Sequence, residues 1–405
     1  MSAPPPPVPK HIIRSHTSQV NVLHVSSDNE RIYSGDAAGT VVITSTRSLR
    51  AIATWKAHTD GLLGVQEWDA SIITHGRDNK LHVWTGVREP TRSLGGSAAL
   101  PGLQTPELRY SLDVNALNYC RFSLLPLPEE MQTEERKALL AVPNLVESAH
   151  ADIWTLPGKQ RLHAAIGKAD QEVPAPDGRG VRNPIGIIMS MHLSSIHHPH
   201  AVGRARLRLL CGYENGSVTM RGYTPEDKEV SIEGIGWESM WTVRLHVESV
   251  MALTVSMDGS FALSVSADHL IGRYSLAEAE SAADPKDACT VYKTKHPGNA
   301  SVAIKDDGRI CAVGGWDGKV RLYSTRTFKP LGTLTYHKKN CQCVAFTRSQ
   351  PQAPASATLA AGAGGEEDDE DDMTEREKAE RTRWLVSGGQ DSRVAIWSLM
   401  NFGKT

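Results

Sequence analysis

Short runs of alternating apolar and polar residues recur along this chain, with turn residues between them. Four stretches share one frame, at residues 74–84, 264–274, 313–323 and 387–397. In each, an aspartate follows the first residue (Thr, Ser, Val and Ser, respectively) by four positions, and an aromatic residue stands six positions after that aspartate. An aspartate turn between two alternating runs is typical of a β-hairpin, so strands are predicted on both sides of each turn.

A histidine precedes each of these turns. The separations are 20, 22, 21 and 54 residues for the pairs His58 and Asp78, His246 and Asp268, His296 and Asp317, and His337 and Asp391. The last separation contains an obvious insertion. This spacing resembles that of WD repeats, in which each unit forms one four-stranded blade. The resemblance implies hydrogen-bonded tetrads made of His58, Thr74, Asp78 and Trp84; of His246, Ser264, Asp268 and Tyr274; of His296, Asp317 and Tyr323; and of His337, Ser387, Asp391 and Trp397.

Three further units are degenerate. The first has His16 but Ala38 and Thr44 in place of the aspartate and tryptophan, the third ends at Trp154 without a clear turn aspartate, and the fourth has Asn215 and Arg221. With the four regular copies they make seven units, whose aromatic positions are 44, 84, 154, 221, 274, 323 and 397. The predicted fold is therefore an all-β, seven-bladed WD-repeat β-propeller, with the surplus residues in loops.

The last unit supplies only three strands before residue 405. We therefore expect residues 11–14 to form the outer strand of the last blade, which removes an exposed sheet edge. The predicted organisation is a flexible Pro-rich lead over 1–9 and a single propeller over 10–405. Loop insertions are predicted near 126–137 and 157–184, and an acidic, disordered insertion is predicted over 349–383, with an unbroken acidic run at 366–372.

The amino-acid composition argues against several classes of protein. Lys and Arg total 44 against 46 for Asp and Glu, so the chain lacks the excess of positive charge that a surface binding nucleic acid over its whole extent would need. We found neither a run of about 18 apolar residues nor a signal-peptide pattern, so we expect a soluble, intracellular protein. Six cysteines in 405 residues are too sparse for a disulfide framework.

The sequence offers only weak evidence for a catalytic or metal-binding site. A set such as His58, Thr74 and Asp78 resembles a catalytic triad, but four copies favour a structural role, because an active site is needed only once. Other clusters are better explained by loops or strands: His197, His198 and His200; Cys341 and Cys343; Arg204, Arg206 and Arg208. No catalytic residue, metal site or cofactor is predicted.

Several stretches are more specific than WD repeats in general, namely 112–122, 260–274, 308–324, 328–334 and 336–340. Together they resemble the WD-repeat family of fungal ASTRA-associated protein 1, whose animal relatives are called guanine nucleotide-binding protein beta subunit-like protein 1. The resemblance runs from His16 to Trp397. It implies a subunit of the ASTRA assembly that is linked to chromatin remodelling and to the assembly of phosphatidylinositol-3-kinase-related proteins. The implied partners are helical-repeat adaptors, RuvB-like ATPases and those giant kinase-related proteins, in the nucleus or in both nucleus and cytoplasm.

Three functions stay open at this point. The first is a propeller adaptor, for which Trp237 and Trp241 are candidate partner contacts if exposed, or core residues if they pack between blades. The second is a histone or chromatin reader that acts through acidic surfaces or through 366–372. The third, an enzyme, lacks convergent acids, bases or metal ligands beyond the repeat. No direct nucleic-acid or membrane contact is predicted.

Overall fold

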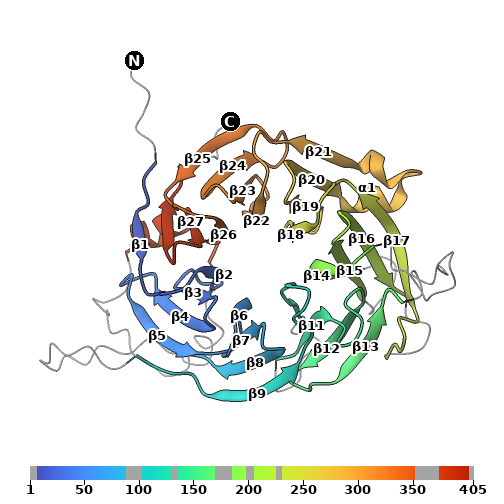
Figure 1. The fold of residues 1–405 in the computed structure, drawn as a ribbon, viewed down its shortest axis with the longest axis horizontal. Coiled ribbons are helices and arrows are strands. Elements are labelled where there is room, and N and C mark those ends of the chain that lie inside the picture. The colour runs from blue at the N-terminus through green and yellow to red at the C-terminus, as the bar shows by residue number, and fades with distance from the viewer. Residues whose placement is uncertain are drawn as a thin grey trace, which may run out of the picture. The chain divides into compact units, whose positions relative to one another are not determined.

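The computed structural model describes residues 7–87, 103–128, 136–168, 185–197, 205–224, 230–351 and 374–400. They form seven four-stranded sheets, the blades of a β-propeller, which confirms the predicted all-β fold (Figure 1). The chain groups into two compact units, residues 1–111 with 303–405 and residues 112–302. The single, undivided propeller domain over 10–405 stays a prediction.

The first unit holds blades 1, 2, 6 and 7, apart from residues 112–113 of β9 and residues 299–302 of β22. Blade 1 consists of β2 (Val20–Val25), β3 (Arg31–Asp36), β4 (Thr40–Ser45) and β5 (Ala51–Lys56). Blade 2 consists of β6 (Leu62–Trp68), β7 (Ser71–Gly76), β8 (Lys80–Thr85) and β9 (Leu108–Asp113). Blade 6 consists of β22 (Asn299–Ile304), β23 (Ile310–Gly315), β24 (Lys319–Ser324) and β25 (Pro330–Thr335). Blade 7 consists of β26 (Cys341–Phe346), β27 (Trp384–Gly389), β28 (Val394–Ser398) and β1 (His11–Ile13).

The second unit holds blades 3, 4 and 5. Blade 3 consists of β10 (Ser123–Pro126), β11 (Ala138–Pro143), β12 (Ala151–Leu156) and β13 (Arg161–Ile166). Blade 4 consists of β14 (Ile188–His197), β15 (Ala205–Tyr213), β16 (Ser217–Tyr223) and β17 (Trp237–Arg244). Blade 5 consists of β18 (Val250–Val255), β19 (Phe261–Ser266), β20 (Leu270–Ser275) and β21 (Cys289–Lys293). Helix α1 (Leu276–Ser281) and the short 3-10 helix η2 (Pro285–Ala288) connect β20 to β21.

Blade 7 is completed by the strand from the beginning of the chain, as predicted. Strand β1 pairs antiparallel with β28, with His11 opposite Ile396 and Ile13 opposite Val394. Ile13 is buried in an apolar cluster that blade 7 shares with blade 1, including Val20 and Trp384. The ends of the chain are therefore held together by backbone pairing and by side-chain burial.

The second strand is buried along its whole length in blades 2, 3, 5, 6 and 7. A strand that is covered on both faces must place its polar side chains against hydrogen-bonding partners. This is where Thr74, Ser264 and Ser387 lie, and all three are fully buried. The blade core thus contains the hydroxyl groups that the repeat frame singled out.

Two predicted insertions contain regular structure. Residues 157–184 were predicted as a loop, but β13 lies within them and forms the outer strand of blade 3. Residues 349–383 were predicted to be disordered, but α2 (Glu375–Arg381) forms there, because Thr374 and Glu377 make a capping box. Arg381 donates to the Thr46 carbonyl and Lys10 pairs with Glu380, so α2 is fixed to its own unit. The acidic run 366–372 lies outside the described residues, as do residues 1–6 of the Pro-rich lead. None of the described helices is long and apolar enough to cross a bilayer.

Candidate functional site

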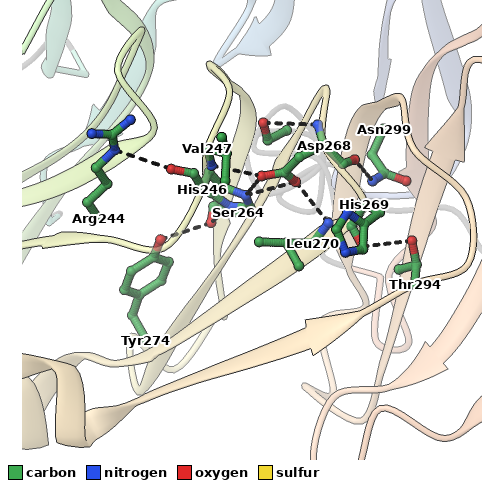
Figure 2. A network of polar contacts seen from close by, with 11 residues as sticks. Arg244, His246, Val247, Ser264, Asp268, His269, Leu270, Tyr274, Thr294 and Asn299 are labelled. Atoms are coloured by element: carbon green, nitrogen blue, oxygen red, sulfur yellow. Dashed lines mark hydrogen bonds and ion pairs between the residues drawn. The ribbon is translucent and has the colours of Figure 1, made fainter.

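Blade 5 contains one of the predicted tetrads, drawn in Figure 2. The Nδ1 atom of His246 lies 3.1 Å from Oδ2 of Asp268, and its Nε2 atom lies 2.7 Å from Oγ of Ser264. The same Oγ lies 3.0 Å from the hydroxyl of Tyr274. His246 precedes β18, Asp268 stands in the β19–β20 turn, and Ser264 and Tyr274 come from the two strands beside that turn. One network therefore ties four segments of the blade together.

Proton positions in this network follow from the chemistry of its members. An ionised carboxylate only accepts, so His246 donates from Nδ1 to Asp268. Where Nε2 carries no proton it accepts from the Ser264 hydroxyl, and Tyr274 donates to Ser264 in turn. Asp268 also accepts from the backbone N–H groups of Val247 and Leu270, at 3.1 and 2.8 Å. The network has the connectivity of a Ser–His–Asp triad, but its serine has no exposed surface.

Blades 2 and 7 repeat this arrangement. In blade 2, Nδ1 of His58 lies 2.8 Å from Asp78, Nε2 lies 2.8 Å from Thr74 Oγ1, and the Trp84 indole donates to the same oxygen at 2.8 Å. In blade 7 the corresponding distances are 3.0 Å for His337 and Asp391, 2.9 Å for His337 and Ser387, and 2.9 Å for Trp397 and Ser387. An indole N–H replaces the tyrosine hydroxyl as the donor to the central oxygen.

Electrostatics agree with these proton positions. Burial lowers the pKa of His58 below its ordinary value, although Asp78 acts in the opposite direction. Burial alone would raise the pKa of Asp268, but hydrogen bonds from His246 and Leu270 outweigh it and leave the pKa lowered. At neutral pH His58 is therefore a neutral imidazole and Asp268 a charged carboxylate, each satisfied by fixed donors or acceptors.

Blade 1 contains a related network that the repeat frame missed. His16 Nδ1 lies 2.9 Å from Asp36 Oδ2, and its Nε2 lies 2.8 Å from Ser34 Oγ. The carboxylate comes from the end of β3 rather than from the turn, two residues before Ala38. The separation of His16 and Asp36 is 20 residues, the same as for His58 and Asp78, and this was the signal available in the sequence. Thr44 is buried in the position of the aromatic donor.

Comparison with known proteins identifies the family. The model of the family "WD domain, G-beta repeat" matches residues 7–45 and 290–324. ASTRA-associated protein 1 of Verticillium alfalfae is 32% identical over 98% of this chain and 94% of its own length. The chain belongs to the ASTRA-associated protein 1 family. The protein of that name from Aspergillus niger is 30% identical over 98% of both chains. The mouse protein "Guanine nucleotide-binding protein subunit beta-like protein 1" is 25% identical over 98% of this chain and 97% of its own.

Blade 6 of this ASTRA-associated protein 1 family member corrects one predicted tetrad. His296 is exposed and does not meet Asp317, so His296, Asp317 and Tyr323 are not a tetrad. Asp317 instead accepts from the Arg321 guanidinium, at 3.1 and 2.5 Å, while Tyr323 is buried. The physical reason is Val313, which occupies the place of Thr74 and offers no hydroxyl to the histidine Nε2. The sequence signal was the pair Val313 and Arg321.

Blades 3 and 4 use other polar side chains. In blade 3, Asp152 is buried and accepts from Asn144 Nδ2 at 2.8 Å. In blade 4, Arg221 is almost fully buried and donates to the Tyr213 hydroxyl at 2.6 Å. Asn215 stands in the β15–β16 turn, where its Oδ1 accepts from the Ser217 N–H. These residues replace the tetrads rather than complete them.

Trp237 and Trp241 were candidate partner contacts if exposed and core residues if packed between blades, and the structure shows the second alternative. They are 4% and 3% exposed and belong to β17, not to a loop. Trp237 packs against His163 and Tyr223, and Trp241 stacks on Tyr274 of the blade 5 tetrad. Large aromatic rings on a strand between two blades bury most of their surface there.

Metal-ligand geometry among the described residues occurs at His58, Asp78 and His82. The contact between His58 and Asp78 is the tetrad hydrogen bond, and His82 stacks on His58 with ring centroids 4.5 Å apart. Burial lowers the pKa of His82 to about 4. A cation would have to displace the proton that joins His58 to Asp78, so hydrogen bonding accounts for this cluster.

The remaining candidate clusters are described only in part. Cys341 and Cys343 are buried on β26, and burial raises the pKa of the Cys341 thiol to about 12. Arg208 pairs with Glu280 of α1, and Arg206 donates to Thr224. Arg204, His198 and His200 lie outside the described residues, and His197 ends β14.

Proposed function

We propose that this chain is a non-catalytic WD-repeat scaffold, a subunit of an ASTRA assembly that is linked to chromatin remodelling and to the assembly of phosphatidylinositol-3-kinase-related proteins. The observation that carries the proposal is the similarity over nearly the whole chain to proteins named ASTRA-associated protein 1. The partners would be helical-repeat adaptors, RuvB-like ATPases and kinase-related giant proteins. The site of action would be the nucleus.

The buried networks support the scaffold role. Their serine and threonine hydroxyls are engaged by a histidine and an aromatic donor and are shielded from solvent. Groups arranged in this way stabilise loops between strands and leave the exposed turns for recognition.

Affinity purification of the tagged chain from its own cells, at low and moderate salt and followed by mass spectrometry, tests this proposal. We expect RuvB-like ATPases, helical-repeat adaptors and kinase-related proteins at both salt concentrations. Recovery of histones alone, lost as salt rises, would contradict the scaffold proposal and favour the chromatin reader. A variant with Asp268→Ala, which disturbs blade 5, provides a matched control for partners that bind only a folded chain. Fractionation of the same cells tests the nuclear location.

A further inference from the structure

Two neighbouring loops of the second unit expose large apolar side chains. The loop between β9 and β10 carries Leu117 and Tyr119, and the loop between β11 and β12 carries Leu145 and Val146. These four residues, which we call the blade 3 platform, are 73%, 57%, 45% and 92% exposed. None of them belongs to the apolar cluster that blades 3 and 4 share, although Cys120 beside Tyr119 does. Several exposed apolar side chains on adjoining turns are typical of an interaction surface.

Buried asparagines hold the two loops together. Asn115 Nδ2 donates to the Asn144 carbonyl and to Ser148 Oγ, each at 2.9 Å. Asn118 Nδ2 donates to the carbonyls of Ser148 and Ile188, at 2.6 and 2.7 Å. Since each asparagine is buried, these bonds are costly to break. The two loops are therefore fixed side by side in the chain as it stands.

The backbone of Tyr119 has a conformation that is uncommon for a tyrosine. Its φ is 56°, in the left-handed region that residues other than glycine rarely adopt. Asn118 and Cys120 on either side are buried, at 0% and 1% exposure, and point inward. Such strain persists only where the surroundings determine the conformation, and it is concentrated at functional sites.

Exposed glutamates lie beside the platform. Glu147 follows Val146 directly, and hydrogen bonds link its loop to those of Glu214 and Glu248. Ile188 donates from its N–H to Ser148, Glu214 donates to Ile187, and Ser249 Oγ donates to the Glu214 carbonyl, at 3.0, 3.0 and 2.9 Å. None of the three glutamates forms an ion pair with another described residue. Arg244 at the end of β17 donates to the His246 carbonyl at 3.4 Å (Figure 2).

We propose that the blade 3 platform docks a segment of a protein partner whose apolar side chains lie next to lysines or arginines. Leu117, Tyr119, Leu145 and Val146 would supply the apolar contact, and Glu147, Glu214 and Glu248 would pair with the basic residues. Because the loops are already fixed by Asn115 and Asn118, little ordering is needed on binding. The proposal rests on the proposed scaffold function, since it assigns that function a docking surface.

The decisive experiment uses the full-length chain purified together with the subunits recovered in the affinity purification. A photoreactive amino acid replaces Val146, and mass spectrometry locates the cross-linked peptide of the partner. We expect a subunit peptide with apolar residues beside Lys or Arg. A cross-link to an acidic peptide, to nucleic acid or to a second copy of this chain would overturn the proposal, as would the absence of any cross-link within a recovered assembly.

Substitutions in the blade 3 platform measure how much it contributes to binding. The double variant with Leu117→Ser and Val146→Ser should bind the cross-linked subunit at least about tenfold more weakly, because apolar anchors at the centre of an interface dominate affinity. The matched control changes Ile232→Ser and Ile235→Ser, which are 66% and 69% exposed elsewhere in the same unit. The control should keep its affinity, and both variants should unfold at the wild-type denaturant concentration. Equal loss in both double variants, or none in either, would contradict the proposal.

The charge arm tests the glutamates separately. With Glu147→Lys and Glu214→Lys, binding should weaken and its dependence on salt should become flatter. Unchanged binding would remove the acidic part of the proposal.

The docking site and the proposed scaffold function can be contradicted separately. If wild type recovers the assembly and the platform variants do so equally well, the docking site is wrong and the scaffold stands. If wild type recovers no such subunit, the scaffold function itself is wrong.

Discussion

Blades 5 and 6 follow the same sequence frame but stabilise their turns differently. Blade 5 joins Asp268 to a buried histidine and a buried serine, whereas blade 6 joins Asp317 to Arg321, four residues further along its own hairpin. The Asp268 side chain is 7% exposed and the Asp317 side chain 38%. The difference teaches that a histidine at the correct spacing enters the blade only if a hydroxyl on the second strand can donate to its Nε2 atom. Ser264 offers that hydroxyl and Val313 does not.

The largest expected effect comes from removing the two aspartates. Asp268→Ala leaves the His246 N–H and two backbone N–H groups without an acceptor in a buried site, so it should lower the free energy of unfolding by about 3–5 kcal/mol. Asp317→Ala breaks a pair that solvent already screens and should cost about 1 kcal/mol or less. Urea unfolding of both variants measures the difference. Equal losses would mean that the two blades do not differ as described.

A second prediction concerns acid. Burial lowers the pKa of His75 to about 3 and that of His163 to about 4, so both are neutral in the folded chain, whereas they gain a proton near pH 6.5 when unfolded. Stability should therefore fall as pH drops from about 6.5 to 4.5, by up to about 1.4 kcal/mol per pH unit for each such histidine. Below about pH 4 a second loss follows, because Asp78 and Asp268 have lowered pKa values and must then be protonated.

Denaturation midpoints between pH 7 and pH 4 check the acid prediction. His75→Gln should make the fall in stability between about pH 6.5 and 4.5 shallower, by the contribution of about one bound proton, because glutamine does not titrate. A profile that is flat between pH 7 and pH 5 in the wild type would contradict the neutral, buried state of these histidines.

The smallest effect concerns the donor to the central hydroxyl. Tyr274→Phe removes one hydrogen bond to Ser264 Oγ and keeps the stacking with Trp241, so it should cost about 1 kcal/mol. Thermal unfolding is sensitive enough to detect this change. A cost of several kcal/mol would instead indicate that the hydroxyl holds the network together, which the remaining bonds of His246 and Asp268 argue against.

Much of the fold could be predicted because its signals are local. Alternating runs around an aspartate turn identify hairpins, and their recurrence gave seven blades and the closing strand. Other features depend on residues distant in sequence. His296 lies at the right spacing, but Val313 decides its exposure. Trp237 and Trp241 are buried because β17 is packed between blades. The mixed polar and apolar residues of β17 do not reveal this packing. Asn115, Asn118 and Asn144 share no frame with the tetrads, so the blade 3 platform appears only in three dimensions.

The central claim is that the buried histidine and aspartate of a blade act as one structural unit. A double-mutant cycle with His246→Gln and Asp268→Asn, measured by urea unfolding, tests it most directly. The account predicts that the double variant loses about 1–3 kcal/mol less than the sum of the two single variants, because either change already breaks the shared bond. Additive losses, within about 0.5 kcal/mol, would contradict the account and show that the two residues stabilise blade 5 independently.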